Sequence, residues 1–82
     1  MAAITPQNIY EHNSGSNTLY VAQFATASTD TWTHTIQGIV GYWATANSAS
    51  MLVQLSTSGT TILNIMANSA GPCTVYVLAQ SM

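Results

Sequence analysis

The 82-residue chain contains no lysine and no arginine, and its only carboxylate side chains are those of Glu11 and Asp30. Charged residues make up 2% of the sequence, against roughly 25% in an ordinary soluble domain. Without cationic side chains the chain has nothing to neutralise phosphates, which argues against a nucleic-acid partner and against a basic membrane-surface helix. At this length we expect one small β domain, residues 1–82, with a core that buries only about 60–65% of the surface of the unfolded chain.

Hydrophobic residues account for 48% of the chain and are interrupted by threonine, serine, asparagine and glutamine throughout. No apolar run approaches the roughly 18 residues of a transmembrane helix, so we expect no membrane partner. The first eight residues lack the basic and the continuous apolar regions of a signal peptide. Cys73 is the single cysteine, so no intrachain disulfide is possible, and we expect it to be a small buried hydrophobe.

Short apolar runs alternate with clusters of glycine, asparagine, serine and threonine about every ten residues, a pattern typical of an all-β domain. No window keeps a 3.6-residue apolar period long enough to predict a helix. We expect an N-terminal arm and turn over 1–17, with the turn cluster at 11–17, followed by about six strands. The predicted strands are 18–26, 31–36, 39–46, 51–56, 61–67 and 73–80.

The last three of these strands are separated by loops of four to five residues, each with a glycine, and predict a three-stranded meander over 51–80. Strand 73–80 carries apolar residues on both of its faces, and strand 61–67 has no charged face. A single sheet of a monomer would alternate apolar and polar residues more cleanly. The pattern therefore favours a small antiparallel sandwich or barrel, and an oligomer in which a second sheet face packs on a neighbour.

The titratable side chains do not assemble into a catalytic motif. There is no Gly-x-Ser-x-Gly turn for a nucleophile, and the two carboxylates both lie in or beside predicted turns. Asp30 and His34 would share a face of a strand but lie about 13 Å apart, too far for a shared metal ligand set. We therefore expect no enzyme activity, no cofactor and no metal site, although three His34 side chains around a threefold axis remain a possible intersubunit site.

Aromatic residues are the candidate anchors of the core or of an interface. Trp32, flanked by Asp30 and His34 on one strand face, also resembles a sugar-stacking patch, which makes a small carbohydrate- or surface-binding module the alternative function. The sequence does not separate core from interface anchors. The candidates are Tyr20, Phe24, Trp32, Tyr42, Trp43 and Tyr76.

Residues 17–80 are rich in threonine, serine, alanine and asparagine, predict no helix, and end in the strand Thr74-Val75-Tyr76-Val77-Leu78-Ala79. In these general features the chain resembles the small β-rich structural proteins of tailed bacteriophage virions. Capsid decoration, or cement, proteins are the nearest class. The resemblance implies a protein made in the host cytoplasm that binds the outer surface of the phage head. It also implies a homo-oligomer, with a trimer favoured, and a major capsid protein as its partner. A tail or fibre subunit of the virion is the next expectation.

Overall fold

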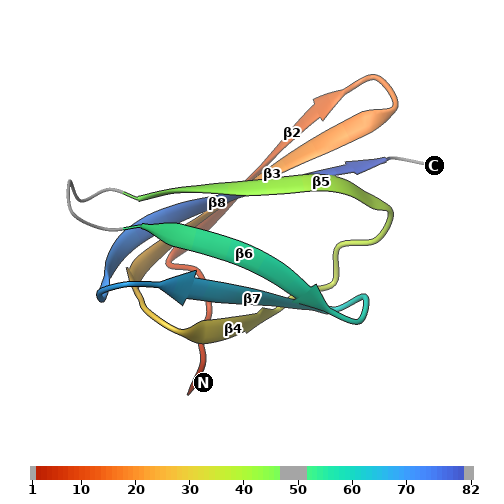
Figure 1. Ribbon diagram of the computed structural model, residues 1–82. Coiled ribbons are helices and arrows are strands. Elements are labelled where there is room, and N and C mark those ends of the chain that lie inside the picture. Colours follow the sequence, from red (N-terminus) through yellow and green to blue (C-terminus); the bar gives the residue numbers. More distant parts are fainter. Residues whose placement is uncertain (1, 47–51, 81–82) are drawn as a thin grey trace.

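The computed structural model describes residues 2–46 and 52–80, and within these ranges it contains strands and no helix (Figure 1). This confirms the all-β fold class. The strands, in chain order, are β1 (Ala2–Ala3), β2 (Asn8–Ser14), β3 (Asn17–Ala27), β4 (Asp30–Thr33), β5 (Ile39–Ala46), β6 (Val53–Ser58), β7 (Ile62–Ala67) and β8 (Gly71–Gln80).

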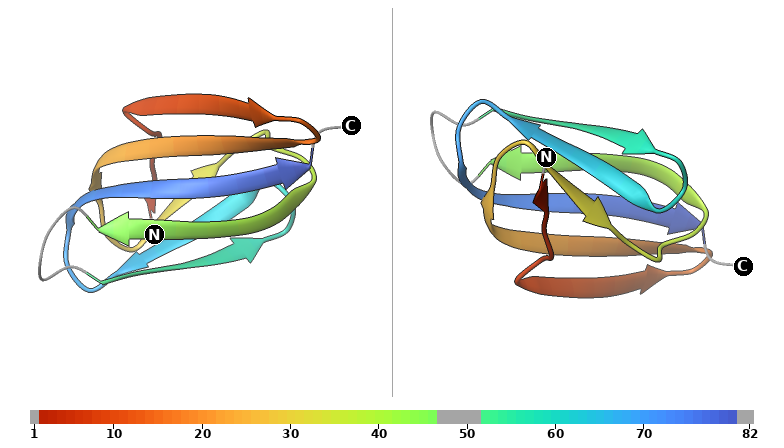
Figure 2. Two further views of the ribbon diagram at one scale, coloured as in Figure 1. Left: turned by 90° about the horizontal axis from the view of Figure 1, so that it is seen from above. Right: turned by 90° about the horizontal axis from the view of Figure 1, so that it is seen from below.

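The strands form two four-stranded sheets that face each other as a sandwich (Figures 1 and 2). The long sheet has the order β2-β3-β8-β5 and is antiparallel throughout. The short sheet has the order β1-β4-β7-β6, in which only the two-residue β1 pairs in parallel. The tip of the β2–β3 hairpin rises away from the short sheet, so part of the long sheet extends beyond its partner layer (Figure 1).

The N-terminal arm expected over 1–17 is wrong for most of its length, because β2 is a regular strand paired with β3 over seven residues. The turn expected at 11–17 is reduced to Gly15 and Ser16. Gly15 has a φ of 64° and Ser16 has no positive φ, as in a type II′ turn, whose first central residue is glycine. The turn matches the right-handed twist of the two strands, which lets pairing continue up to it.

The three C-terminal strands exist, but the meander expected over 51–80 is wrong. β6 and β7 form a hairpin in the short sheet, whereas β8 crosses to the long sheet and pairs with β3 and β5. The crossing gives β8 a central position with a neighbour on each side. Strand 31–36 is also shorter than expected, since β4 ends at Thr33 and the chain then passes from one sheet to the other.

The core lies between the sheets and is built from alternate residues of β8 and β7. Every second residue of β8 faces inward, and these residues meet Leu63 and Ile65 of β7, which are fully buried. Burial of a medium-sized apolar side chain stabilises a fold by about 1.5–3 kcal/mol, so these strands supply much of the folding free energy. The buried members on β8 are Cys73, Val75, Val77 and Ala79.

Candidate functional site

The outer face of the long sheet carries a continuous apolar row. Residues directly opposite each other on paired strands share a face, and the registers place Tyr10 opposite Val21, Val21 opposite Tyr76, and Tyr76 opposite Trp43. These four residues, here the aromatic row, cross all four strands over about 14 Å. The next row along the sheet pairs Leu19 with Leu78 and widens the apolar surface.

Two members of the aromatic row stack on each other. The rings of Trp43 and Tyr76 are nearly parallel, at an interplanar angle of 8°, with their centroids 5.3 Å apart. Trp43 nevertheless remains 47% exposed and Tyr10 48% exposed. The stacked pair therefore presents a large, rigid apolar surface to the outside. Tryptophan and tyrosine are also among the side chains that contribute most to binding at protein interfaces.

The outer face of the short sheet has a different chemistry. Thr31 and Thr33 of β4 lie beside Asn64 of β7, whose amide donates hydrogen bonds to Ser56 Oγ at 3.2 Å and to Ser58 Oγ at 2.9 Å. Ile62 and Met66 share this face, opposite Thr33 and Gln54 respectively. The outer face of the long sheet differs in that its apolar residues include the stacked aromatic pair, and its row of Asn8, Gln23, Thr74 and Thr45 is polar.

The six candidate anchors divide into three groups. Phe24 and Trp32 are buried in the core, and Tyr20 is partly buried against it. Tyr42 lies on the inner side of β5, opposite Val77, but close to the open edge of the sandwich. Trp43 and Tyr76 belong to the outer aromatic row. Tyr10 is not among the six candidates because it lies in the expected N-terminal arm, where the β-forming pair Ile9 and Tyr10 is only a weak strand signal.

The interpretation of Trp32 as a sugar-stacking residue is wrong, because the side chain is only 4% exposed. Along β4, Thr31 and Thr33 lie on one face and Trp32 on the other, and the tryptophan face is the inner one. Trp32 packs edge to face against Phe24, with centroids 5.5 Å apart, and against His34, with centroids 5.4 Å apart. No ring face is left for a ligand.

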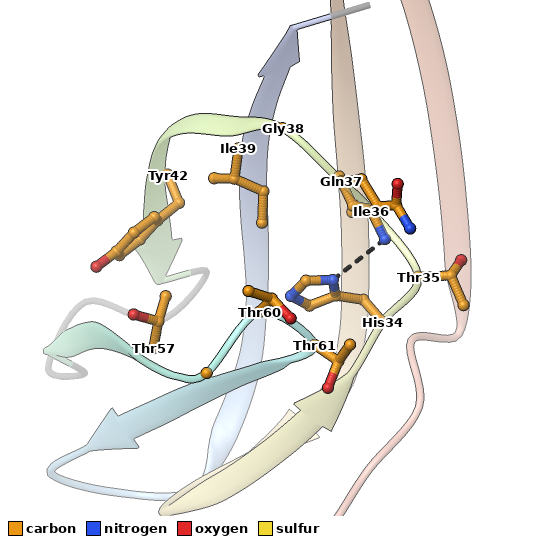
Figure 3. A pocket seen from close by; sticks show the side chains of 11 residues that line it. His34, Thr35, Ile36, Gln37, Gly38, Ile39, Tyr42, Thr57, Thr60 and Thr61 are labelled. Atoms are coloured by element: carbon orange, nitrogen blue, oxygen red, sulfur yellow. Dashed lines mark hydrogen bonds between the residues drawn. The ribbon is translucent and has the colours of Figure 1, made fainter.

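A pocket of about 670 Å³ opens at the end of the sandwich where the chain passes from β4 to β5 (Figure 3). The segment 34–38 forms one wall and is tied to both sheets: His34 N–H donates to Thr61 O at 2.7 Å, and Gln80 N–H donates to Gly38 O at 2.8 Å. Gly38 has a φ of 71°, and a Cβ there would lie 3.1 Å from Gln80 O. Only glycine fits this close backbone approach without strain.

His34 lies in the wall of this pocket and is 6% exposed. Its Nδ1 accepts a hydrogen bond from Ile36 N–H at 3.2 Å, which assigns the neutral tautomer with the proton on Nε2. Burial lowers the pKa of His34 below 6.5, so the ring is neutral at pH 7. The location inside a pocket argues against His34 clusters around a threefold axis.

The remaining titratable groups do not converge. Burial, and then the negative charge of Asp30, raise the pKa of the Cys73 thiol, which keeps it protonated and unreactive in the core. Among residues 2–46 and 52–80, no group of three or more histidine, cysteine, aspartate or glutamate side chains is arranged to hold a metal ion. The described part of the chain also contains no helix that is long and apolar enough to cross a membrane.

Comparison with known proteins gives no match: no protein-family model, curated protein or solved structure matches the chain. Functional inference therefore rests on the surface chemistry of the fold and on the two features described above, the aromatic row and the pocket beside His34.

Proposed function

We propose that this chain is a non-enzymatic structural subunit of a virion, with capsid decoration of a phage head as its role and a tail or fibre position as the variant of that role. The observation that carries the assembly part is the aromatic row, an exposed apolar surface that crosses a whole sheet. The virion part is supported by the resemblance of residues 17–80 to small phage structural proteins.

The apolar part of this outer face consists of the aromatic row and of Leu19 and Leu78 in the next row. The row on the other side supplies hydrogen-bonding groups from Asn8, Gln23, Thr74 and Thr45. Protein interfaces combine an apolar centre with a polar rim, so this arrangement suits a protein contact.

The chemistry of the face also suits permanent assembly. The rows that contain Tyr76, Leu78 and Thr74 include no aspartate, glutamate, lysine or arginine, so no full charge has to leave water when the face is covered. The mechanism is passive: the subunit adds buried apolar area to a lattice. Pairing with a second copy and packing on a capsid protein both use this face.

Light scattering on the purified protein tests the assembly part. We expect a homo-oligomer at micromolar concentration, and we expect Trp43→Lys to dissociate it because a charge would then have to be buried. Thr33→Lys, which places the same charge on the outer face of the short sheet, is the matched control and should leave the mass unchanged. A stable wild-type monomer would contradict the assembly proposal.

The copy number of the chain in purified particles tests the virion part. Many copies per head would support decoration, and a handful would support a vertex, tail or fibre position. Absence of the chain from particles would contradict the virion proposal while leaving the oligomer test unaffected.

A further inference from the structure

We propose that the pocket beside His34 binds a neutral saccharide of one to three rings. This inference goes beyond the assembly role and uses the other side of β5. The pocket is lined by side chains from both sheets and by the segment between them. The residues that carry the argument are His34, Ile36, Ile39, Tyr42, Thr57 and Thr60.

The side chains that face the pocket include both apolar and hydrogen-bonding groups. Figure 3 shows Tyr42 and Ile39 on one side of the pocket and Thr57, Thr60 and His34 on the other, whereas Thr35 and Gln37 direct their side chains away from it. In Figure 3 the ring nitrogen of His34 that is not bonded to Ile36 is directed toward Thr60. With its proton on Nε2, His34 offers a fixed donor there.

The charge of the lining restricts the ligand. Neither Glu11 nor Asp30 lines the pocket, and the chain has no lysine or arginine, so no lining side chain carries a full charge at pH 7. A phosphate, a carboxylate or an amine would find no counter-charge there. The ligand that matches this lining is therefore uncharged.

The mixed lining distinguishes a saccharide from a purely apolar ligand. An apolar molecule would cover the Nε2–H donor of His34 and the threonine hydroxyls without replacing their hydrogen bonds to water, which opposes its binding. A sugar ring offers a C–H face to the Tyr42 ring and hydroxyl acceptors to His34, Thr57 and Thr60. The volume of about 670 Å³ lies within the range typical of small-molecule sites.

Titration of the ¹⁵N-labelled protein with cellobiose, maltose and N,N′-diacetylchitobiose, each up to millimolar concentration, tests the proposal by NMR. We expect at least one of these sugars to shift the His34 ring resonances and the Ile36 amide in a saturable manner. If none of the three sugars perturbs these signals, the proposal is wrong.

Variants at Tyr42 and Trp43, which are adjacent on β5, and at Thr57 on β6 locate the binding. Tyr42 is 37% exposed, so Tyr42→Ala should leave the fold intact. Because the ring contact with the sugar is lost, its affinity for the sugar should fall by up to about tenfold. Thr57→Val, which removes one hydroxyl with little change of shape, should also lower the affinity for the sugar. Trp43→Ala is the matched control on the outer face and should have no effect on affinity. Loss of binding in Trp43→Ala but not in Tyr42→Ala would contradict the proposed site and leave the assembly role untouched.

Discussion

Tyr42 and Trp43 are neighbours in the sequence but take part in different surfaces of the molecule. Because successive side chains of a strand point to opposite faces, Tyr42 lies on the inner side of β5 at the pocket and Trp43 lies on the outer side in the aromatic row. The pair shows how a single residue step on β5 separates the proposed saccharide site from the proposed assembly surface. It also explains why the two proposals can be tested independently.

His34 makes the stability of the fold dependent on pH. Its pKa is lowered by burial from 6.5, so between the folded and the unfolded pKa the unfolded chain binds a proton that the folded chain does not. The free energy of unfolding therefore decreases as the pH falls through this window, by about 1.4 kcal/mol for each unit of pKa lowering. Denaturant unfolding of the wild type at about pH 7.5 and about pH 5 should show this loss.

Two histidine variants separate this effect from other acid effects. His34→Asn retains an acceptor for Ile36 N–H and removes the titrating ring, so its pH dependence in the same range should be smaller than that of the wild type. His12 is exposed on β2, and His12→Asn should preserve the wild-type dependence. An unchanged pH dependence in His34→Asn would show that another group is responsible.

β8 is the element that links the core to the proposed interface. Its inward residues include the buried Val75 and Val77, and its outward residues Tyr76 and Leu78 contribute to the apolar outer face. The short sheet covers only the inward side. On the other side of β8, Tyr76 and Leu78 lie between the polar Thr74 and Gln80, and the proposed assembly would cover these two apolar side chains.

The Trp43–Tyr76 pair should stabilise the long sheet beyond the contribution of either ring. A double-mutant cycle with Trp43→Ala and Tyr76→Ala, measured by denaturant unfolding, should give a coupling of about 0.5–1.5 kcal/mol, because the rings are stacked. Tyr10 and Trp43 lie at opposite ends of the aromatic row, and the same cycle for this pair should give a coupling near zero. A coupling of zero for Trp43 and Tyr76 would contradict the stacked geometry.

At the scale of the whole molecule, the two outer faces of the sandwich differ in their apolar side chains. The short sheet presents the hydroxyl and amide groups linked by the Asn64 hydrogen bonds together with Ile62 and Met66, and the long sheet presents the aromatic row. With a formal charge of −2, the chain has little electrostatic repulsion to oppose association. The proposed assembly uses the face that carries the aromatic row.

This charge distribution predicts that self-association is insensitive to sodium chloride. The chain has no lysine or arginine, so copies of it cannot form lysine– or arginine–carboxylate pairs with one another. Sedimentation at about 0.05 M and about 0.5 M salt should give nearly equal association constants, since salt screens charges and not apolar contacts. Sulfate should strengthen association, because it strengthens apolar burial. Dissociation by moderate sodium chloride would contradict an apolar interface.

Local patterns predicted most of the strands. The bounds 39–46 are those of β5, and 61–67 and 73–80 differ from β7 and β8 by one or two residues at their starts. Part of 51–56 lies outside the described residues, and β6 begins at Val53. β2 was missed because polar residues around Glu11 and His12 obscure the strand pattern, and only pairing with β3 reveals it. The pocket left no signal in the sequence, since it combines residues from β5, β6 and the segment 34–38.

The sequence by itself determined the fold class, the absence of cationic side chains and the presence of strands with two apolar faces, because these depend on composition and on the two-residue period of a strand. Only the tertiary structure decided which aromatic residues are inside. Trp32 has polar neighbours, Thr31 and Thr33, and Trp43 lies between Tyr42 and Ala44, yet Trp32 is in the core and Trp43 is on the outer face. The pairing of β4 with β7 and of β5 with β8 determines which face of each strand is buried. This pairing depends on contacts between residues far apart in the chain, which local sequence patterns do not contain.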